Sequence, residues 1–146
     1  MFELITDAYW MELESVMRLT SCRLRRGQGK TDVVDLVERL LDDEIAHARR
    51  LVWRIAQLGG TVPEVKETVA EPLLPSAAED AVDVVSLAVL VVRAADRALS
   101  HYERLAEAAR MVDPVTYELV LELLDDEGRH RDAFELLVAG RATVAA

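Results

Sequence analysis

The sequence contains a single cysteine, Cys22, among its 146 residues. One cysteine excludes a disulfide within the chain and a zinc cluster built on cysteines. Glycine and proline are also scarce, with 6 and 4 residues, whereas an all-β fold of this length needs many turns. A chain without an internal disulfide fits a reducing compartment, and we therefore expect a cytoplasmic protein.

Basic residues are outnumbered, with 17 Lys and Arg against 27 Asp and Glu, which gives a formal net charge of −10. A nucleic-acid partner is not expected, because phosphate binding needs a basic surface. A membrane partner is not expected either, since the longest apolar run, residues 81–92, is interrupted by Asp83 and Ser86. It is also shorter than the about 20 residues that span a bilayer. The N-terminal segment lacks the basic start of a signal peptide.

Hydrophobic residues, by contrast, make up 51% of the chain, enough to build the core of one domain over residues 1–146. They recur at steps of three and four, which is the helical period, in four segments. The first two segments are residues 2–26 and 31–58. The third starts between residues 76 and 83 and ends near 111, and the fourth runs from 113 to about 139. The pattern therefore predicts four long helices.

The links between these segments predict how the helices are connected. The first and third links are short, so each joins two antiparallel helices. The second link, residues 59–76, contains Pro63, Pro72 and Pro75. At about 3.3 Å per residue it is long enough to return along a whole bundle. The sequence therefore predicts an all-α fold, an antiparallel four-helix bundle with one long crossover between the second and third helices.

The pattern LLDDExxH occurs twice, ending once at His47 and once at His130. Glu44 and His47, like Glu127 and His130, stand three residues apart and share one face of a helix. Two such pairs that face each other across a bundle bring four metal-ligating side chains to one point. The alternative, two Glu–His pairs on solvated faces, is worth only a few tenths of a kcal/mol per pair and leaves the repeat unexplained.

The first helix offers one more carboxylate, Glu12, which precedes Glu44 and lies on the inward face. Glu12 stands 32 residues before Glu44, and the residue 32 positions before Glu127 is Ala95. A fourth carboxylate is therefore missing from the second half. Asp96 stands beside it and would be a ligand only if the helical register slipped, which turns a side chain by about 100°. The predicted metal ligands are therefore Glu12, Glu44, His47, Glu127 and His130.

Some neighbouring residues have two interpretations. One aspartate of each pair, Asp42–Asp43 and Asp125–Asp126, would accept the second ring N–H of the histidine in the other half. The alternative is a solvated acidic face that attracts cations. Tyr102 either packs as a core tyrosine or hydrogen-bonds a ligand carboxylate. We expect Glu14 at the surface. His101 is expected there too, with a contact behind the metal ligands or at a subunit interface as the alternative.

These features resemble the ferritin-like superfamily, in particular the bacterioferritins and the di-iron domain of rubrerythrins. The resemblance implies that Glu44 and Glu127 bridge two metal ions and act as the catalytic residues. Glu12 and His47 would complete the site of the first ion, and His130 would cap the second. The strings that carry the resemblance are MEL at 11–13, DDEIAH at 42–47, LGGTVP at 58–63 and DDEGRH at 125–130.

Members of this superfamily bind Fe(II), reduce dioxygen or hydrogen peroxide, and often assemble into iron-storing shells. The resemblance therefore implies iron as the metal, and carboxylate with imidazole ligands also suits manganese. The site is either a di-iron site or a partly filled di-metal site, because Ala95 leaves the second ion with fewer ligands. Ile45 stands where bacterioferritins have their haem-ligating methionine, so a haem held at that position is not expected. The sequence has no C-x-x-C pair, so a complete rubrerythrin is not expected either.

Three functions remain open at this point. The first is oxidation of Fe(II) with dioxygen or peroxide, for iron storage or detoxification. The second is a di-metal oxygenase or oxidase that acts on a small organic substrate, with the gap at Ala95 on the substrate side. The third is a structural member of the family that binds metal poorly.

We also expect a homo-oligomer. Residues 82–92 are apolar around most of the helix, so a side that the other helices leave open needs cover from the crossover or from another subunit. A two-fold contact is favoured, and a larger shell is implied only by the resemblance.

Overall fold

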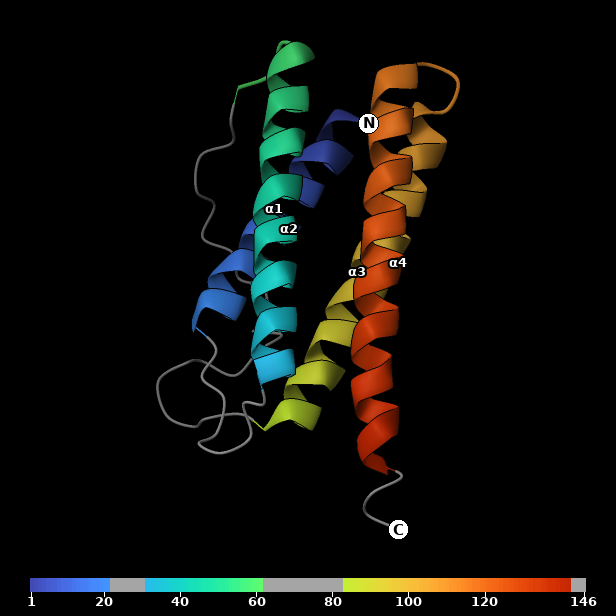
Figure 1. Ribbon diagram of the computed structural model, residues 1–146. Coiled ribbons are helices and arrows are strands. Elements are labelled where there is room, and N and C mark those ends of the chain that lie inside the picture. The colour runs from blue at the N-terminus through green and yellow to red at the C-terminus, as the bar shows by residue number, and fades with distance from the viewer. Residues whose placement is uncertain (22–30, 62–82, 143–146) are drawn as a thin grey trace.

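The protein was analysed as a computed structural model, which describes residues 1–21, 31–61 and 83–142. These residues form four α-helices, α1 (Phe2–Ser21), α2 (Thr31–Gln57), α3 (Val84–Ala109) and α4 (Pro114–Ala142), and no strand (Figure 1). The predicted all-α four-helix bundle is therefore confirmed. The expectations for Cys22 and for most of the crossover, residues 62–76, lie outside the described residues.

The helices form two hairpins that pack side by side, α1 with α2 and α3 with α4 (Figure 1). Helix α2 ends at the opposite end of the bundle from the start of α3, so these two helices run in the same direction. A connection between them has to cover the length of the bundle, as predicted. None of the helices that the structure describes has a long enough apolar stretch to cross a lipid bilayer.

Local signals explain where the helices begin and end. The carboxylate of Asp83 accepts a hydrogen bond of 2.9 Å from the backbone N–H of Ser86 and caps the start of α3. After the end of α2, Gly59 has a φ of 79°, a conformation that glycine adopts without steric cost. The next residue, Gly60, donates its backbone N–H to the carbonyl of Ile55 at 3.0 Å and closes the last turn.

The core consists of two apolar clusters with a layer of buried polar residues between them. Along α2, buried Glu44 lies between Leu40 of one cluster and Leu51 of the other, and along α4 Glu127 is flanked in the same way. The clusters exclude water from this polar layer on both sides. The buried members of the first are Ile5, Ala8, Leu51, Ile55, Ala98, Tyr102, Leu105, Ala106, Val120 and Leu123, and those of the second are Leu19, Leu40, Leu87, Ala88, Val91 and Phe134.

The apolar start of α3 is less open than its composition suggests. Its hydrophobic side chains between Val84 and Val92 are all buried or half-buried in the single chain. The largest exposed apolar side chains lie elsewhere and include Trp53 on α2 and Met111 in the turn between α3 and α4. The predicted cover of α3 by another subunit therefore stays a prediction, and the exposed apolar groups of other helices are the better candidates for a subunit contact.

The turn between α3 and α4 is tied to the end of α2 by a buried ion pair. Asp113 precedes α4 and accepts hydrogen bonds from the Arg54 guanidinium at 2.7 and 2.6 Å and from the Thr116 hydroxyl at 2.6 Å. It also caps the helix by accepting the Thr116 backbone N–H at 3.2 Å. Burial by itself raises the pKa of Asp113, but Arg54 and Thr116 outweigh it and lower the pKa from 3.8 to about 2.

We expect Asp113→Ala to lower the free energy of unfolding at pH 7 by about 3 kcal/mol, because it removes a helix cap and leaves a largely buried Arg54 without its carboxylate. Since folding lowers the pKa of Asp113, its contribution is complete above pH 3.8 and is lost as the pH falls toward 2. Denaturant unfolding across this range should therefore show the wild type and the variant converging in acid.

Glu107→Ala is the matched control, since Glu107 forms an exposed ion pair with Arg110 near the same turn. Its effect should stay below about 0.5 kcal/mol at every pH. Equal effects of the two substitutions would contradict the role assigned to Asp113.

Candidate metal centre

Four of the five predicted ligands lie together inside the bundle. The ligand atoms of Glu12, Glu44, His47 and Glu127 are all within 4.8 Å of one another, and all four residues are buried. They come from α1, α2 and α4, and their spacing on each helix turns them inward. His47 Nδ1 is 3.6 Å from Glu12 Oε2 and 3.5 Å from Glu127 Oε1.

His130 completes the group from the other side. Its Nδ1 atom lies 3.7 Å from Glu127 Oε1 and 3.9 Å from Glu44 Oε1. The ring of His130 faces that of His47, with the ring centres 5.9 Å apart. Glu127 thus stands between the two imidazoles, and all five predicted ligands meet at one place. Neither Glu–His pair lies on a solvated outer face.

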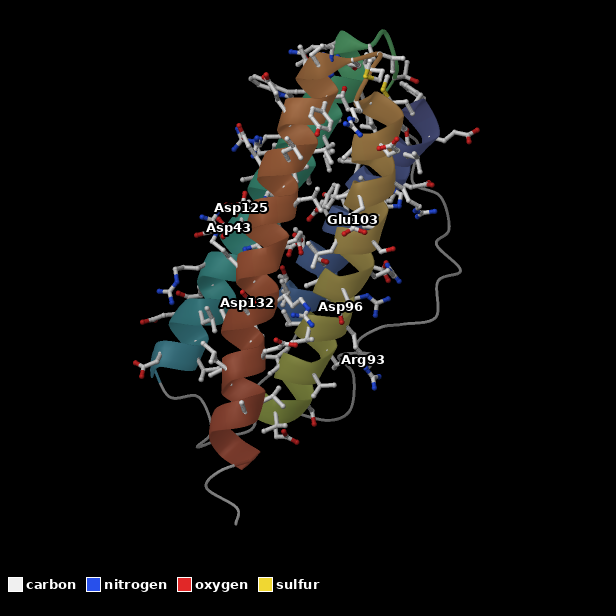
Figure 2. All side chains as sticks on the ribbon, turned by 90° about the vertical axis from the view of Figure 1, so that its right-hand side faces the viewer. Asp43, Arg93, Asp96, Glu103, Asp125 and Asp132 are labelled. Atoms are coloured by element: carbon white, nitrogen blue, oxygen red, sulfur yellow. The ribbon has the colours of Figure 1, made fainter. Side chains whose placement is uncertain are left out.

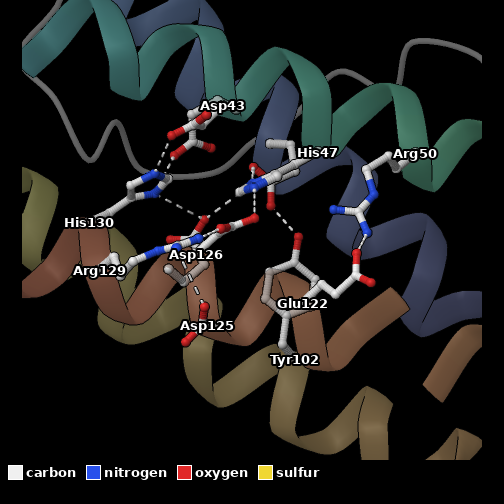
Figure 3. A network of polar contacts seen from close by, with 12 residues as sticks. Asp43, His47, Arg50, Tyr102, Glu122, Asp125, Asp126, Arg129 and His130 are labelled. Atoms are coloured by element: carbon white, nitrogen blue, oxygen red, sulfur yellow. Dashed lines mark hydrogen bonds and ion pairs between the residues drawn. The ribbon is translucent and has the colours of Figure 1, made fainter. Parts of the chain in front are cut away.

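An aspartate of the other repeat contacts the Nε2 atom of each histidine, on the side of the ring that faces away from the glutamates. His47 Nε2 lies 3.2 Å from Asp126 Oδ2, and His130 Nε2 lies 3.0 Å from Asp43 Oδ2 (Figure 3). This confirms the prediction that one aspartate of each DD pair holds the histidine of the other half. The two aspartates occupy the same position in their LLDDExxH motifs, so the centre has approximate two-fold symmetry.

These contacts determine which nitrogen faces the interior. An ionised aspartate has only acceptor oxygens, so the Nε2 atom of each neutral imidazole must donate its proton to the aspartate. The lone pair is then on Nδ1, which points at the glutamates. This is the arrangement in which an outer carboxylate fixes the tautomer of a metal-binding histidine.

Four buried atoms of this cluster have no hydrogen-bond partner among the described residues, and they face one another at the centre of the bundle. Buried polar atoms without a partner are rare in folded proteins, and a group of them calls for an explanation. Carboxylate oxygens and imidazole nitrogens are the ligands that iron and manganese accept, so the donor set fits a metal ion. The four atoms are Glu12 Oε2, His47 Nδ1, Glu127 Oε1 and His130 Nδ1.

Glu12 is fixed by α3 as well. The phenol of Tyr102 points into the cluster and donates a hydrogen bond to Glu12 Oε1, which leaves Oε2 for the interior (Figure 3). Both interpretations of Tyr102 therefore hold, because it belongs to the core and also binds a predicted ligand. The surface position favoured for its neighbour His101 was wrong, because this ring is buried and its Nε2 lies 2.8 Å from the backbone carbonyl oxygen of Leu4.

The charges of the cluster are strongly coupled. Burial, a hydrogen bond with Glu12 and repulsion from Glu12 and Glu127 raise the pKa of Glu44 well above its ordinary value. Burial opposes protonation of His47, but Glu12 and Glu127 raise its pKa to about 9. Burial likewise favours the neutral form of Glu127, yet His130 and His47 lower the pKa of this carboxyl. Without a metal ion, the excess of negative charge in the cluster is thus offset by retained protons.

The second half of the centre lacks a terminal carboxylate, as the repeat predicted. Ala95 is buried and lines the space next to Glu44, Glu127 and His130. Asp96 is not part of the cluster. Its side chain is 53% exposed and pairs with Arg131 Nε at 2.6 Å on the solvent side of α3 and α4 (Figure 2). The helical register does not slip, and Asp96 is excluded as a ligand in this arrangement.

A cavity of about 40 Å³ opens beside Ala95. Charged residues line its outer end, and their position there was not predicted from the sequence. Glu14 was expected at the surface but is half-buried at this end of the cavity. It forms ion pairs with Arg18 and with Arg97, whose Nη2 lies 3.1 Å from Glu14 Oε2. One signal for this contact was available, because Glu14 and Arg97 occupy equivalent positions in the two halves of the repeat.

Comparison with known protein families identifies the chain. The family model of the ferritin-like domain matches residues 12–141. The chain belongs to the ferritin-like domain family. The match begins at Glu12 and includes both ExxH motifs, so it covers all five predicted ligands of this ferritin-like domain. A comparison with curated protein sequences finds no match.

Several solved structures share the fold of this ferritin-like domain. A bacterioferritin-related protein from Bacteroides fragilis, described as a dodecameric thioferritin, is 20% identical, with a TM-score of 0.85 over 99% of this chain and 87% of its own. A ferritin-like di-iron-carboxylate protein from Bacillus anthracis is 18% identical, with a TM-score of 0.76 over 94% of both chains. The bacterioferritin of Desulfovibrio desulfuricans is 19% identical, with a TM-score of 0.69 over 94% of this chain and 77% of its own. At these identities the likeness establishes the fold alone.

We expect Asp126→Ala to lower the affinity of the domain for Mn²⁺ by about 10- to 100-fold, because His47 loses the acceptor that fixes its tautomer. Asp125→Ala is the matched control, since Asp125 is the preceding residue on α4 but is exposed and pairs with Arg129 on the surface. Competition with a chelating dye measures the affinity, and ¹⁵N NMR of the imidazoles reports the tautomer. Equal affinities of the two variants would contradict the positioning role of Asp126.

Proposed function

We propose that this ferritin-like domain is a di-iron carboxylate protein that oxidises Fe(II) with dioxygen or hydrogen peroxide, for iron storage or detoxification. The observation that supports it most directly is the set of four buried ligand atoms that face one another without hydrogen-bond partners among the described residues. In this proposal Fe(II) and the oxidant are the substrates, and the domain acts as a ferroxidase. Manganese is the other metal that the donor set accepts.

The proposed roles follow from the positions of the residues. Glu44 and Glu127 come from opposite repeats and would bridge two ions. Glu12 and His47 would complete one site, and His130 would cap the other. Iron held by these residues would supply the electrons for reduction of the oxidant.

The surrounding residues would prepare these ligands. Asp126 and Asp43 hold a proton on Nε2 of each imidazole, so that Nδ1 is the nitrogen that would bind a metal ion once any proton on it is released. Tyr102 orients the Glu12 carboxylate. The two apolar clusters exclude water and strengthen the attraction between a cation and the buried carboxylates.

Anaerobic addition of Fe(II) followed by oxygen tests the proposal. We expect the wild type to oxidise Fe(II) faster than buffer, with oxygen consumption matching the iron oxidised, and Glu127→Ala to fall to the rate of buffer. Iron retained beyond a few atoms per chain supports storage. A wild type that neither binds Fe(II) nor accelerates its oxidation would overturn the proposal and favour a structural, metal-poor member of the family.

A second function, oxidation of a small organic molecule, is favoured by one specific observation. The cavity beside Ala95 reaches the cluster and has mainly apolar walls, which suits an organic substrate more than a metal ion. Oxygen consumption that depends on an added organic compound, without accumulation of iron, would support this second function.

A homo-oligomer in the cytoplasm is part of the proposal. Trp53 and Ile45 expose large apolar surface on α2, and side chains of this kind gather at subunit contacts. Neither the number of subunits nor a shell follows from these residues. Native mass spectrometry and sedimentation measure the assembly, and a monomer at high concentration would contradict it. A haem held at the position of Ile45 is not part of the proposal.

A further inference from the structure

The cavity beside Ala95 connects the candidate metal centre with the outer surface of the bundle. Its inner end is lined by Glu12, Glu44, Glu127 and His130, which are the predicted ligands other than His47. Its outer end carries the Arg18, Glu14 and Arg97 group. The walls between them are mainly apolar, with Ser15 as a polar residue among the apolar side chains of Met11, Leu19, Leu40, Leu90, Val91, Ala94, Ala95 and Ala98.

The repeat shows what is missing at the inner end. Glu12 in the first half corresponds to Ala95 in the second, just as Glu44 corresponds to Glu127. His47 therefore has a carboxylate oxygen from another helix, Glu12 Oε2, at 3.6 Å, whereas in the second half Ala95 and His130 line the cavity together and no carboxylate stands at the equivalent position. His130 and Glu127 line this inner end, and each has a buried atom, Nδ1 and Oε1, without a hydrogen-bond partner among the described residues.

The balance of charge favours an anion in this space when metal is bound. Two divalent ions bring four positive charges, and the three glutamates of the cluster bring three negative ones. The groups that would touch the two ions thus leave one positive charge uncompensated, whereas the carboxylates of Asp43 and Asp126 lie on the far, Nε2 side of the imidazoles. The outer end adds two guanidinium groups against one carboxylate, so an anion is favoured along the whole path.

We propose that the metal-loaded domain binds a short-chain aliphatic monocarboxylate in this cavity, with its carboxylate in the place of the missing glutamate and its alkyl chain against the apolar walls. A water molecule needs about 10–15 Å³ of such a volume, so a cavity of about 40 Å³ accepts a chain of a few atoms. A longer tail would reach the Arg18 and Arg97 end. The inference rests on the proposed metal centre and identifies the ligand class of its second site.

Propionate is the probe, and the domain is loaded with Mn²⁺, which is stable in air and relaxes the NMR signals of a nearby ligand. The manganese content of each sample is measured first. We expect saturable relaxation of the propionate methyl protons by the loaded domain, and none by the metal-free domain at the same ionic strength. Propanol, which has the same chain without the charge, should bind at least tenfold more weakly.

Two variants close the cavity in different ways. Ala95→Glu supplies the carboxylate from the chain itself, so we expect it to abolish propionate binding while the manganese content stays the same or rises. Ala94→Phe fills the wall without touching a predicted ligand and should weaken binding at least tenfold, which keeps the test valid if the longer side chain of Ala95→Glu overpacks the core. Ser100→Glu is the matched control, since it adds the same charge to an exposed position of α3. It should bind propionate like the wild type.

The outcomes separate the two proposals. A domain that holds manganese but does not bind propionate saturably overturns the inference and leaves the metal centre intact. Equal binding by Ala95→Glu, Ala94→Phe and the wild type also overturns it, because the ligand then binds outside the cavity. A domain that holds no manganese and no iron overturns the metal centre and this inference together.

Discussion

Replacement of Glu127 by alanine is expected to lower the affinity of the domain for Mn²⁺ and Fe²⁺ by at least about 100-fold, more than the loss of an outer hydrogen-bond partner costs. Glu127 Oε1 lies 3.5 Å from His47 Nδ1 and 3.7 Å from His130 Nδ1, between the two halves of the centre. Its removal takes a negative charge from both proposed sites at once. Metal analysis after dialysis should therefore find neither ion retained.

Glu118→Ala is the matched control, since Glu118 lies on the same helix but is exposed. It should retain metal like the wild type. Circular dichroism of Glu127→Ala checks that the helices are intact. A folded Glu127→Ala variant that retains the wild-type amount of metal would falsify the assignment of Glu127 as a shared ligand.

The second large effect is expected in the metal-free domain, where the variant Glu44→Gln should be more stable than the wild type. Folding places Glu44 in a buried cluster with Glu12 and Glu127, and burial with repulsion raises its pKa well above the ordinary value of 4.5. Glutamine has the same shape without the charge, so the variant avoids this cost. Because a raised pKa in the folded state costs stability once the unfolded chain has lost its proton, we expect the free energy of unfolding at pH 7 to be higher for Glu44→Gln than for the wild type.

The sign of the pH dependence gives a further check. A carboxyl group whose pKa is raised by folding destabilises the protein only above its unfolded pKa. The advantage of Glu44→Gln should therefore grow as the pH rises above 4.5 and vanish below it. Glu38→Gln, at an exposed position of α2, should change the stability by less than about 0.5 kcal/mol at any pH.

Added metal should make the wild type more stable than the Glu44→Gln variant, the reverse of the order expected without metal. A ligand that binds only the folded state stabilises it, so Mn²⁺ is expected to stabilise the wild type far more than Glu44→Gln. Thermal unfolding with and without Mn²⁺ measures both effects. If Glu44→Gln were less stable than the wild type without metal, Glu44 would be a residue that stabilises the fold. It would then not be a ligand whose buried charge costs stability.

The helices and the main candidate residues could be predicted because they depend on local patterns. Apolar residues at steps of three and four mark the buried face of a helix wherever the helix lies. Glu44 and His47 share a face because they are three residues apart, and that holds before any tertiary contact forms. The repeated LLDDExxH motif then related the two halves, including Glu12 and Ala95, because an internal repeat places equivalent residues at equivalent positions.

Other features could not be predicted because their partners are far apart in the sequence. His101 looked like a surface residue, since a helical pattern does not reveal that the carbonyl of Leu4, 97 residues away, lies beside it. The same applies to the Asp113–Arg54 ion pair, which joins residues 59 positions apart. Such contacts depend on how far each helix is shifted and rotated against its neighbours.

The sequence by itself determined the four helices, their connection and the five candidate ligands, because spacing along a helix decides which side chains share a face. Only the tertiary structure decided that Asp96 lies outside the cluster, that Asp43 and Asp126 hold the histidines, and that a cavity occupies the space beside Ala95. These properties depend on the packing of one helix against another. Packing is set by the fit of many side chains together, and no single spacing in the sequence records it.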